Sequence, residues 1–278
     1  MATYEQTAEI HHQIEALYQI VGAGRAFIRG HRRIGKSIPI PTGAPNLLEH
    51  DRVFCALSAR AATTKRAVFT VCEAGDGDSA MILARTVMEA GVLMAWMMGG
   101  DGLVRLETYA LFGAALHQRL LNVIETYYRD RPELMRLARD KSDPYTHAIA
   151  QQVFGGKEDT WAYFPHPDKP GKLRKITVKE MFEELQPGGD GFAYAVPYAR
   201  GSQFVHSGPL SVTSAVKHVL RLDTFAVAPV PSTEYREEAL SISNVGMLLV
   251  LSALSGYTGI DLTDGITRVR DAMLAVKD

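Results

Sequence analysis

The chain has 278 residues and a mass of 30.5 kDa, with 30 basic residues against 31 acidic ones. This balance argues against a dedicated nucleic-acid coat protein or a polyacidic binder. An apolar share of 46% with 22% charged residues excludes a disordered chain. Cys55 and Cys72 are too few for a disulfide scaffold and predict small buried side chains in a reducing cytosol. Residues 1–20 lack the apolar core of a signal peptide, so we expect a cytoplasmic protein.

Apolar residues recur at helical spacing along almost the whole chain. The first helix is expected over residues 3–21, where Ile10, Ile14, Leu17 and Val21 form one stripe. Capping residues and glycine stops predict later helices over residues 45–74, 80–98, 103–128, 131–139, 144–153, 193–205 and 233–257, a short one after Thr177 and a last one from Asp261. The fold class predicted is all-α, a single multi-helix bundle with a loop-rich insert near residues 140–190.

One helical domain is expected over residues 1–278, since no linker or repeat divides the chain. An N-terminal helix with a basic loop is expected over residues 1–44. The core helices are expected over 45–139 and 191–278, and the insert between them over 140–190. The insert contains a Gly-, Pro- and Lys-rich stretch at 155–175 that carries Trp161, Tyr163 and Phe164. A loop of this length in a compact domain is typical of a lid over a site.

The longest apolar run extends from Ala80 to Met98 and is almost long enough to cross a bilayer. Arg85 and Glu89 interrupt it near the middle, which is costly in lipid, so a helix buried in a soluble protein without membrane contact is expected. Their spacing of four places both on one helix face. Two interpretations stay open: a buried structural ion pair, or a pair lining an internal pocket in which Arg85 binds an anionic group.

A second polar feature is a row of hydroxyl and imidazole side chains late in the chain. Tyr194, Tyr198, Ser202 and His206 follow one another at spacings of four and therefore share one face of a predicted helix. Such a row could hold a substrate or relay a proton through His206. The alternative is a helix–helix contact held by side-chain hydrogen bonds.

A third feature is a basic segment over residues 25–36, which contains five Arg or Lys residues and no acid. It could contact phosphates or be a solvated loop paired with acidic surface elsewhere. The motifs of phosphate loops, dinucleotide sites, zinc helices and nucleophile elbows do not occur. Glu9 and His12 form one Glu-x-x-His pair without the second pair that a di-iron site needs. We therefore expect no metal and no cofactor.

The stretches LARTVMEAGVLMAWM and YARGSQFVHSG together resemble a bacterial helical family of unknown function. In that family an Arg-x-x-x-Glu helix precedes a Tyr-x-x-x-Ser-x-x-x-His helix, and the matching residues here are Arg85, Glu89, Tyr198, Ser202 and His206. The resemblance spans about residues 45–260. It implies an all-helical fold and no agreed activity.

A weaker resemblance is to the HEPN superfamily, which contains many RNA-cleaving dimers. Its signature, Arg and His separated by four to six residues, is matched by Arg200 and His206 with five between them. Gly201 stands where that motif usually has a polar residue, and the chain is about twice the usual length. The resemblance implies metal-independent RNA cleavage, in which His206 acts as general acid or base and Arg200 or Arg85 stabilises the charged phosphorane.

The favoured prediction is a small-molecule site inside the bundle. His206, Ser202 and Glu89 would be catalytic, with His206 as the acid–base group. The substrate would be bound by four further residues: Arg85, Tyr198, Tyr194 and Arg200. The alternatives are the HEPN-like endoribonuclease, for which RNA is the partner, and a purely structural role for both motifs. Abundant apolar helix surface predicts a homodimer.

Overall fold

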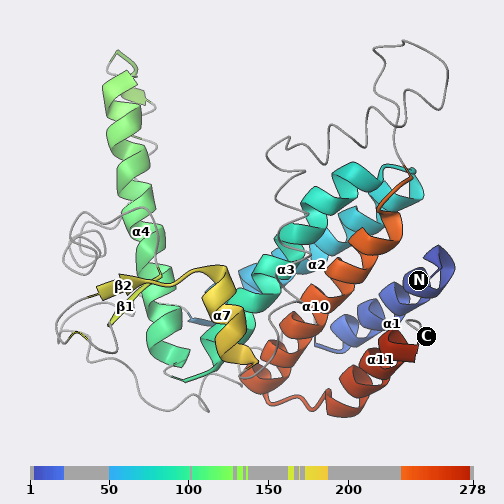
Figure 1. Ribbon diagram of the computed structural model, residues 1–278. Coiled ribbons are helices and arrows are strands. Elements are labelled where there is room, and N and C mark those ends of the chain that lie inside the picture. Colours follow the sequence, from blue (N-terminus) through green and yellow to red (C-terminus); the bar gives the residue numbers. More distant parts are fainter. Residues whose placement is uncertain are drawn as a thin grey trace, which may run out of the picture. The chain divides into compact units, whose positions relative to one another are not determined.

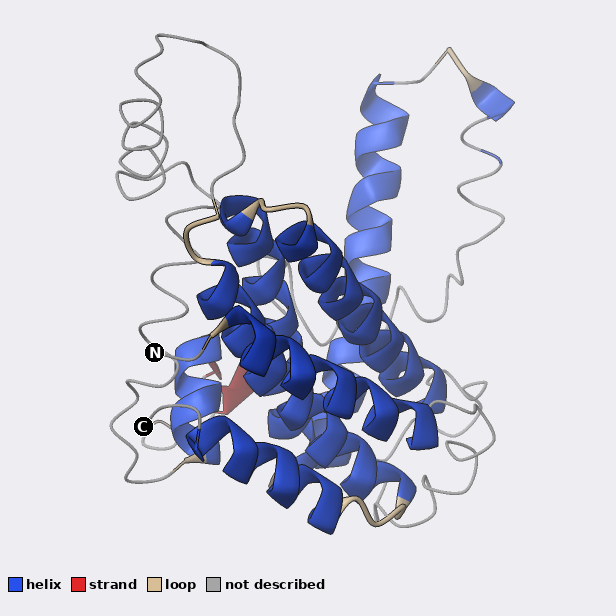
Figure 2. Ribbon diagram, turned by 90° about the vertical axis from the view of Figure 1, so that its right-hand side faces the viewer, coloured by secondary structure: helices blue, strands red, loops and turns tan. Residues whose placement is uncertain are grey.

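The computed structural model describes residues 3–21, 50–100, 102–127, 162–165, 173–186 and 233–275, with a few positions near 130–136 and residue 169. Within these ranges the elements in chain order are α1 (Tyr4–Val21), α2 (His50–Glu73), α3 (Gly77–Met98), α4 (Gly102–Tyr127), β1 (Tyr163–Pro165), β2 (Leu173–Lys175), α7 (Val178–Leu185), α10 (Arg236–Thr258) and α11 (Thr263–Ala275) (Figure 1). Figure 2 shows how helices dominate these ranges. The predicted all-α class is confirmed.

Each predicted helix that falls in the described ranges is present, with ends shifted by a few residues. α3 begins earlier than the expected residue 80, because Asp76 caps it and accepts a hydrogen bond from the backbone N–H of Ser79 at 2.9 Å. α10 begins at Arg236 rather than near residue 233, after Tyr235 in a left-handed conformation. The helices predicted over 144–153 and 193–205 lie outside the described residues, as do five of the nine residues of the one over 131–139.

The chain divides into two compact units. The larger unit contains Met1–Ile34, Phe54–Gly99 and Val178–Asp278, and the smaller contains Gly35–Val53 and Gly100–Thr177. In the smaller unit α4 buries Leu106 and Phe112, while β1 and β2 form an antiparallel pair in which Phe164 is opposite Arg174. This short pair lies inside the stretch expected to be an irregular loop. Strands of three residues are too short to show a period of two in the sequence.

The core of the larger unit is a pair of parallel helices, α3 and α10 (Figure 1). Gly77 at the start of α3 lies against Glu234 just before α10, and Met98 at the end of α3 touches Gly256 near the end of α10. Midway the backbones meet, so that a Cβ on Gly246 would lie 2.7 Å from the Cα of Met88. Glycine at this crossing allows the closest approach that two helices can make.

Three helices complete the larger unit around this pair. α1 packs on α10 and α11, and it buries Ile10 and Ile14 in the contact. α2 reaches α10 through Phe54, whose ring stacks on that of Tyr257 at a centroid distance of 4.4 Å. α7 packs on α3, where the buried Trp96 indole N–H donates a 2.7 Å hydrogen bond to Glu184.

Two described helices, α3 and α10, are long and apolar enough to cross a membrane by length and composition alone. Within the fold, 50% of the apolar window of α3 and 61% of that of α10 are buried, largely against each other. The central helices of a soluble bundle have the same composition. α3 was expected to be a buried helix, and eleven of its 22 residues are buried, whereas Ile82 is 38% exposed.

Candidate functional site

Arg85 and Glu89 form the ion pair that their spacing predicts. The Nε atom of Arg85 donates to the Oε1 atom of Glu89 at 2.8 Å, within one turn of α3. The Arg85 side chain is 15% exposed and that of Glu89 is 35% exposed. The pair is therefore partly buried rather than enclosed, and it lies on the side of α3 that does not face α10.

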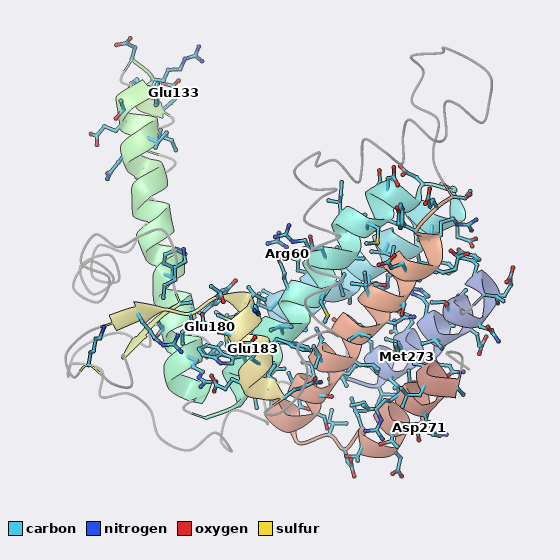
Figure 3. The ribbon with its side chains drawn as sticks, viewed as in Figure 1. Arg60, Glu133, Glu180, Glu183, Asp271 and Met273 are labelled. Atoms are coloured by element: carbon cyan, nitrogen blue, oxygen red, sulfur yellow. The ribbon has the colours of Figure 1, made fainter. Side chains whose placement is uncertain are left out.

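A similar pair on α7 shows what an ordinary surface pair of this chain looks like. Lys179 and Glu183 are also four residues apart, but their charged atoms are 3.6 Å apart and their side chains are 65% and 49% exposed. Glu183 lies on α7, near Glu180 (Figure 3). The Arg85–Glu89 pair is shorter and less exposed, so its side chains are held in a more defined position.

The second predicted row lies outside the described residues. This holds for each of its members and for the neighbouring arginine: Tyr194, Tyr198, Arg200, Ser202 and His206. The basic segment 25–36 and Trp161 lie outside them as well, while Tyr163 and Phe164 are part of β1 in the smaller unit. The convergence of the Arg85–Glu89 pair and the polar row at residues 194–206 on one cavity stays a prediction. So does the role of the stretch at 155–175 as a lid.

The structure contains a buried titratable cluster that the sequence did not predict. Lys65 of α2 is fully buried, and its Nζ atom lies 2.5 Å from the Nδ1 atom and 3.3 Å from the backbone oxygen of His11 on α1. The imidazole of His11 stacks on the ring of Phe69 at a centroid distance of 4.2 Å. Just outside, Arg66 donates to Glu15. The cluster therefore joins α1 to α2.

Burial lowers the pKa of both central groups of this cluster. Desolvation lowers the pKa of Lys65 to about 7, with a further lowering by Arg66 and an opposing effect of Glu15. Desolvation, together with the charge of Lys65, lowers the pKa of His11 to about 3. A neutral imidazole accepts from the Lys65 amine at Nδ1 and carries its proton on Nε2. His11 is only 4% exposed and Lys65 is fully buried, so the pair is enclosed between α1 and α2.

A sequence signal for Lys65 exists. Buried residues of α2 follow one another at spacings of three and four, namely Ala61, Lys65, Val68 and Cys72. A lysine therefore occupies a core position of an otherwise apolar stripe. Its partner His11 is one of two adjacent histidines on α1, and nothing local distinguishes it from His12. Among the described residues no group of three or more His, Cys, Asp or Glu side chains is arranged to hold a metal ion.

The model of a family of unknown function, DUF5677, matches residues 51–219. The matched range covers more than half of the chain and contains both predicted rows, the one on α3 and the one at residues 194–206. α1, α10 and α11 lie outside it. No curated protein and no solved structure matches the chain.

Proposed function

The chain belongs to DUF5677, a family of unknown function, and we propose that it binds a small molecule at a site that the Arg85–Glu89 pair shares with the polar row at residues 194–206. Arg85 and Glu89 on α3 contribute one side of this site. Tyr198, Ser202 and His206 contribute the other. The ligand is a compact molecule with an anionic group, which pairs with the guanidinium of Arg85.

The observation that carries this proposal is the Arg85–Glu89 pair itself. It is formed at 2.8 Å and partly buried, on a helix whose mean hydropathy would suit a core without charges. A charged pair placed in such a helix weakens folding relative to apolar side chains of similar volume. A role in binding would account for this cost.

Within the proposed site each side chain has a chemical task. His206 is the general acid or base, since imidazole is the side chain whose ordinary pKa lies nearest neutral pH. Ser202 and Glu89 hold the proton of His206 and the reacting group of the substrate in position. Arg85 and Arg200 bind the anionic part of the substrate, and the hydroxyl groups of Tyr194 and Tyr198 donate hydrogen bonds to it.

We expect Glu89→Ala and His206→Ala to lose a ligand that co-purifies with the wild-type chain. The measurement is native mass spectrometry of the purified protein, compared with the mass after denaturation. Glu89→Ala should lower the free energy of unfolding by only about 1 kcal/mol, because the Glu89 side chain is 35% exposed. The matched control is Glu183→Ala, which removes the exposed pair on α7 and should keep the ligand. Wild-type protein without any bound small molecule, or Glu89→Ala protein that retains it, would argue against the site.

RNA cleavage is the alternative, and it depends on Arg200, His206 and the basic segment 25–36. Incubation of the wild-type chain with single-stranded RNA in the presence of EDTA tests it directly. Cleavage that disappears in His206→Ala would favour the HEPN-like function over a small-molecule site, because that reaction needs no metal.

The homodimer also stays a prediction for the wild-type chain. Exposed apolar side chains such as Ile20 and Ile82 in the larger unit and Tyr127 in the smaller one support it. Light scattering should give twice the chain mass of 30.5 kDa. A monomer at tens of micromolar would contradict it.

A further inference from the structure

A cavity of about 370 Å³ lies in the larger unit between α1, α10 and α11, away from the Arg85–Glu89 pair. Its volume is within the range of small-ligand sites. Aliphatic side chains from all three helices form most of its wall, among them Ile10, Val245, Leu249, Ile266, Met273 and Leu274. Met273 on α11 can be located in Figure 3. An apolar body of modest size therefore fits this cavity.

The inner wall of the cavity carries one buried amide, that of Asn244 on α10. Its Nδ2 atom donates to the backbone oxygen of Thr7 on α1 at 3.2 Å. Because that oxygen can only accept, the orientation of the amide is determined, and Oδ1 is the atom left over. Among the described residues nothing donates to Oδ1, although the Asn244 side chain is fully buried. A buried acceptor without a donor destabilises the fold by about 1–3 kcal/mol.

The outer part of the cavity is polar. Ser241 and Ser252 line it on α10, and Arg270 lines it on α11. The guanidinium of Arg270 is held only loosely by its neighbour Asp271, at 3.4 Å, and the Arg270 side chain is 63% exposed. An anionic group at the mouth would therefore find a cation beside it.

We propose that this cavity binds an amphipathic organic anion. Its apolar body lies between α1, α10 and α11, an N–H or O–H group of the ligand donates to the Oδ1 atom of Asn244, and its acidic group pairs with Arg270. This site is separate from the proposed function, since neither Arg85 nor Glu89 lines it and the family match ends before α10.

The test uses 8-anilinonaphthalene-1-sulfonate, which combines apolar rings, an N–H donor and an anionic sulfonate. Its fluorescence is titrated with the full-length wild-type chain and three variants. Asn244→Leu should weaken binding about tenfold, which corresponds to about 1.4 kcal/mol, because the ligand loses its acceptor. Ser252→Trp should abolish binding, because Ser252 is an exposed lining residue and the indole fills the cavity from its mouth. Arg270→Gln should weaken binding several-fold at low salt and less at high salt.

The matched control is Ala59→Trp, which adds the same indole to an exposed position of α2 that does not line the cavity. It should bind the dye as the wild-type chain does. Equal binding by Ser252→Trp and Ala59→Trp would place the dye elsewhere and overturn the proposal. Absence of dye binding to the wild-type chain, which is expected if water alone fills the cavity, would also overturn the proposal. A dimer that Ser252→Trp dissociates would overturn it as well. Ser252→Trp decides the matter even if Asn244→Leu does not fold.

Discussion

Gly246→Ala is expected to lower the free energy of unfolding by about 3 kcal/mol or more. The added Cβ would lie 2.7 Å from the Cα and 2.8 Å from the backbone N of Met88. These are backbone atoms, so no side-chain rotation relieves the contact. α3 and α10 would have to separate along the core of the larger unit. Urea unfolding followed by far-UV circular dichroism measures the loss.

The control for this variant is Gly256→Ala on the same helix. There the nearest atom to the added Cβ is the side-chain Cε of Met98 at 3.5 Å, an ordinary van der Waals distance. Alanine is favoured over glycine inside a helix by up to about 1 kcal/mol, so Gly256→Ala should be neutral or stabilising. If both variants lost the same free energy, close backbone contact at Gly246 would not be the cause.

Lys65→Met is expected to raise the free energy of unfolding at pH 7 by about 2–3 kcal/mol. The fold lowers the pKa of Lys65 from 10.5 to about 7, chiefly by desolvation, which weakens folding by about 4 kcal/mol at neutral pH. Methionine keeps the length of the apolar stem and removes this penalty. It also removes the hydrogen bonds to His11, at a cost of about 1 kcal/mol. Urea unfolding at pH 7 measures the difference.

The pH dependence of the wild-type chain follows from the same pKa. Between pH 7 and pH 10.5 the unfolded chain binds a proton at Lys65 that the folded chain does not, so stability rises with pH in this window. From pH 7 to pH 9 the gain should be about 2 kcal/mol, and Lys65→Met should lose it. Below pH 6.5 stability falls further, because His11 is protonated in the unfolded chain and in the folded chain only near pH 3.

Arg66→Met is the matched control, since it changes a neighbouring cation whose side chain is 49% exposed. Its ion pair with Glu15 is a surface pair, so the variant should stay within about 1 kcal/mol of the wild type. It should also keep the rise in stability between pH 7 and pH 9. A Lys65→Met variant with the wild-type pH dependence would contradict the assignment of that rise to Lys65.

The helices and one ion pair were predictable from the sequence because their causes are local. The apolar periodicity of residues 4–21, the Asp76 cap and the i,i+4 spacing of Arg85 and Glu89 involve groups within one or two turns of each other. The residues that cap a helix and share its faces are neighbours in the chain. The fold class followed from these local signals.

The partners of each helix were decided only by the tertiary structure. Nothing near residue 91 indicates that Gly91 lies against the backbone of Gly246, because that contact joins segments 155 positions apart. The same holds for the burial of Lys65 against His11 and for the Asn244 amide in its cavity. Periodicity states which face of a helix is apolar, but the free energy of packing depends on the shape of the face that covers it. For that reason the sequence determined the helices, and long-range packing decided which polar groups are buried together.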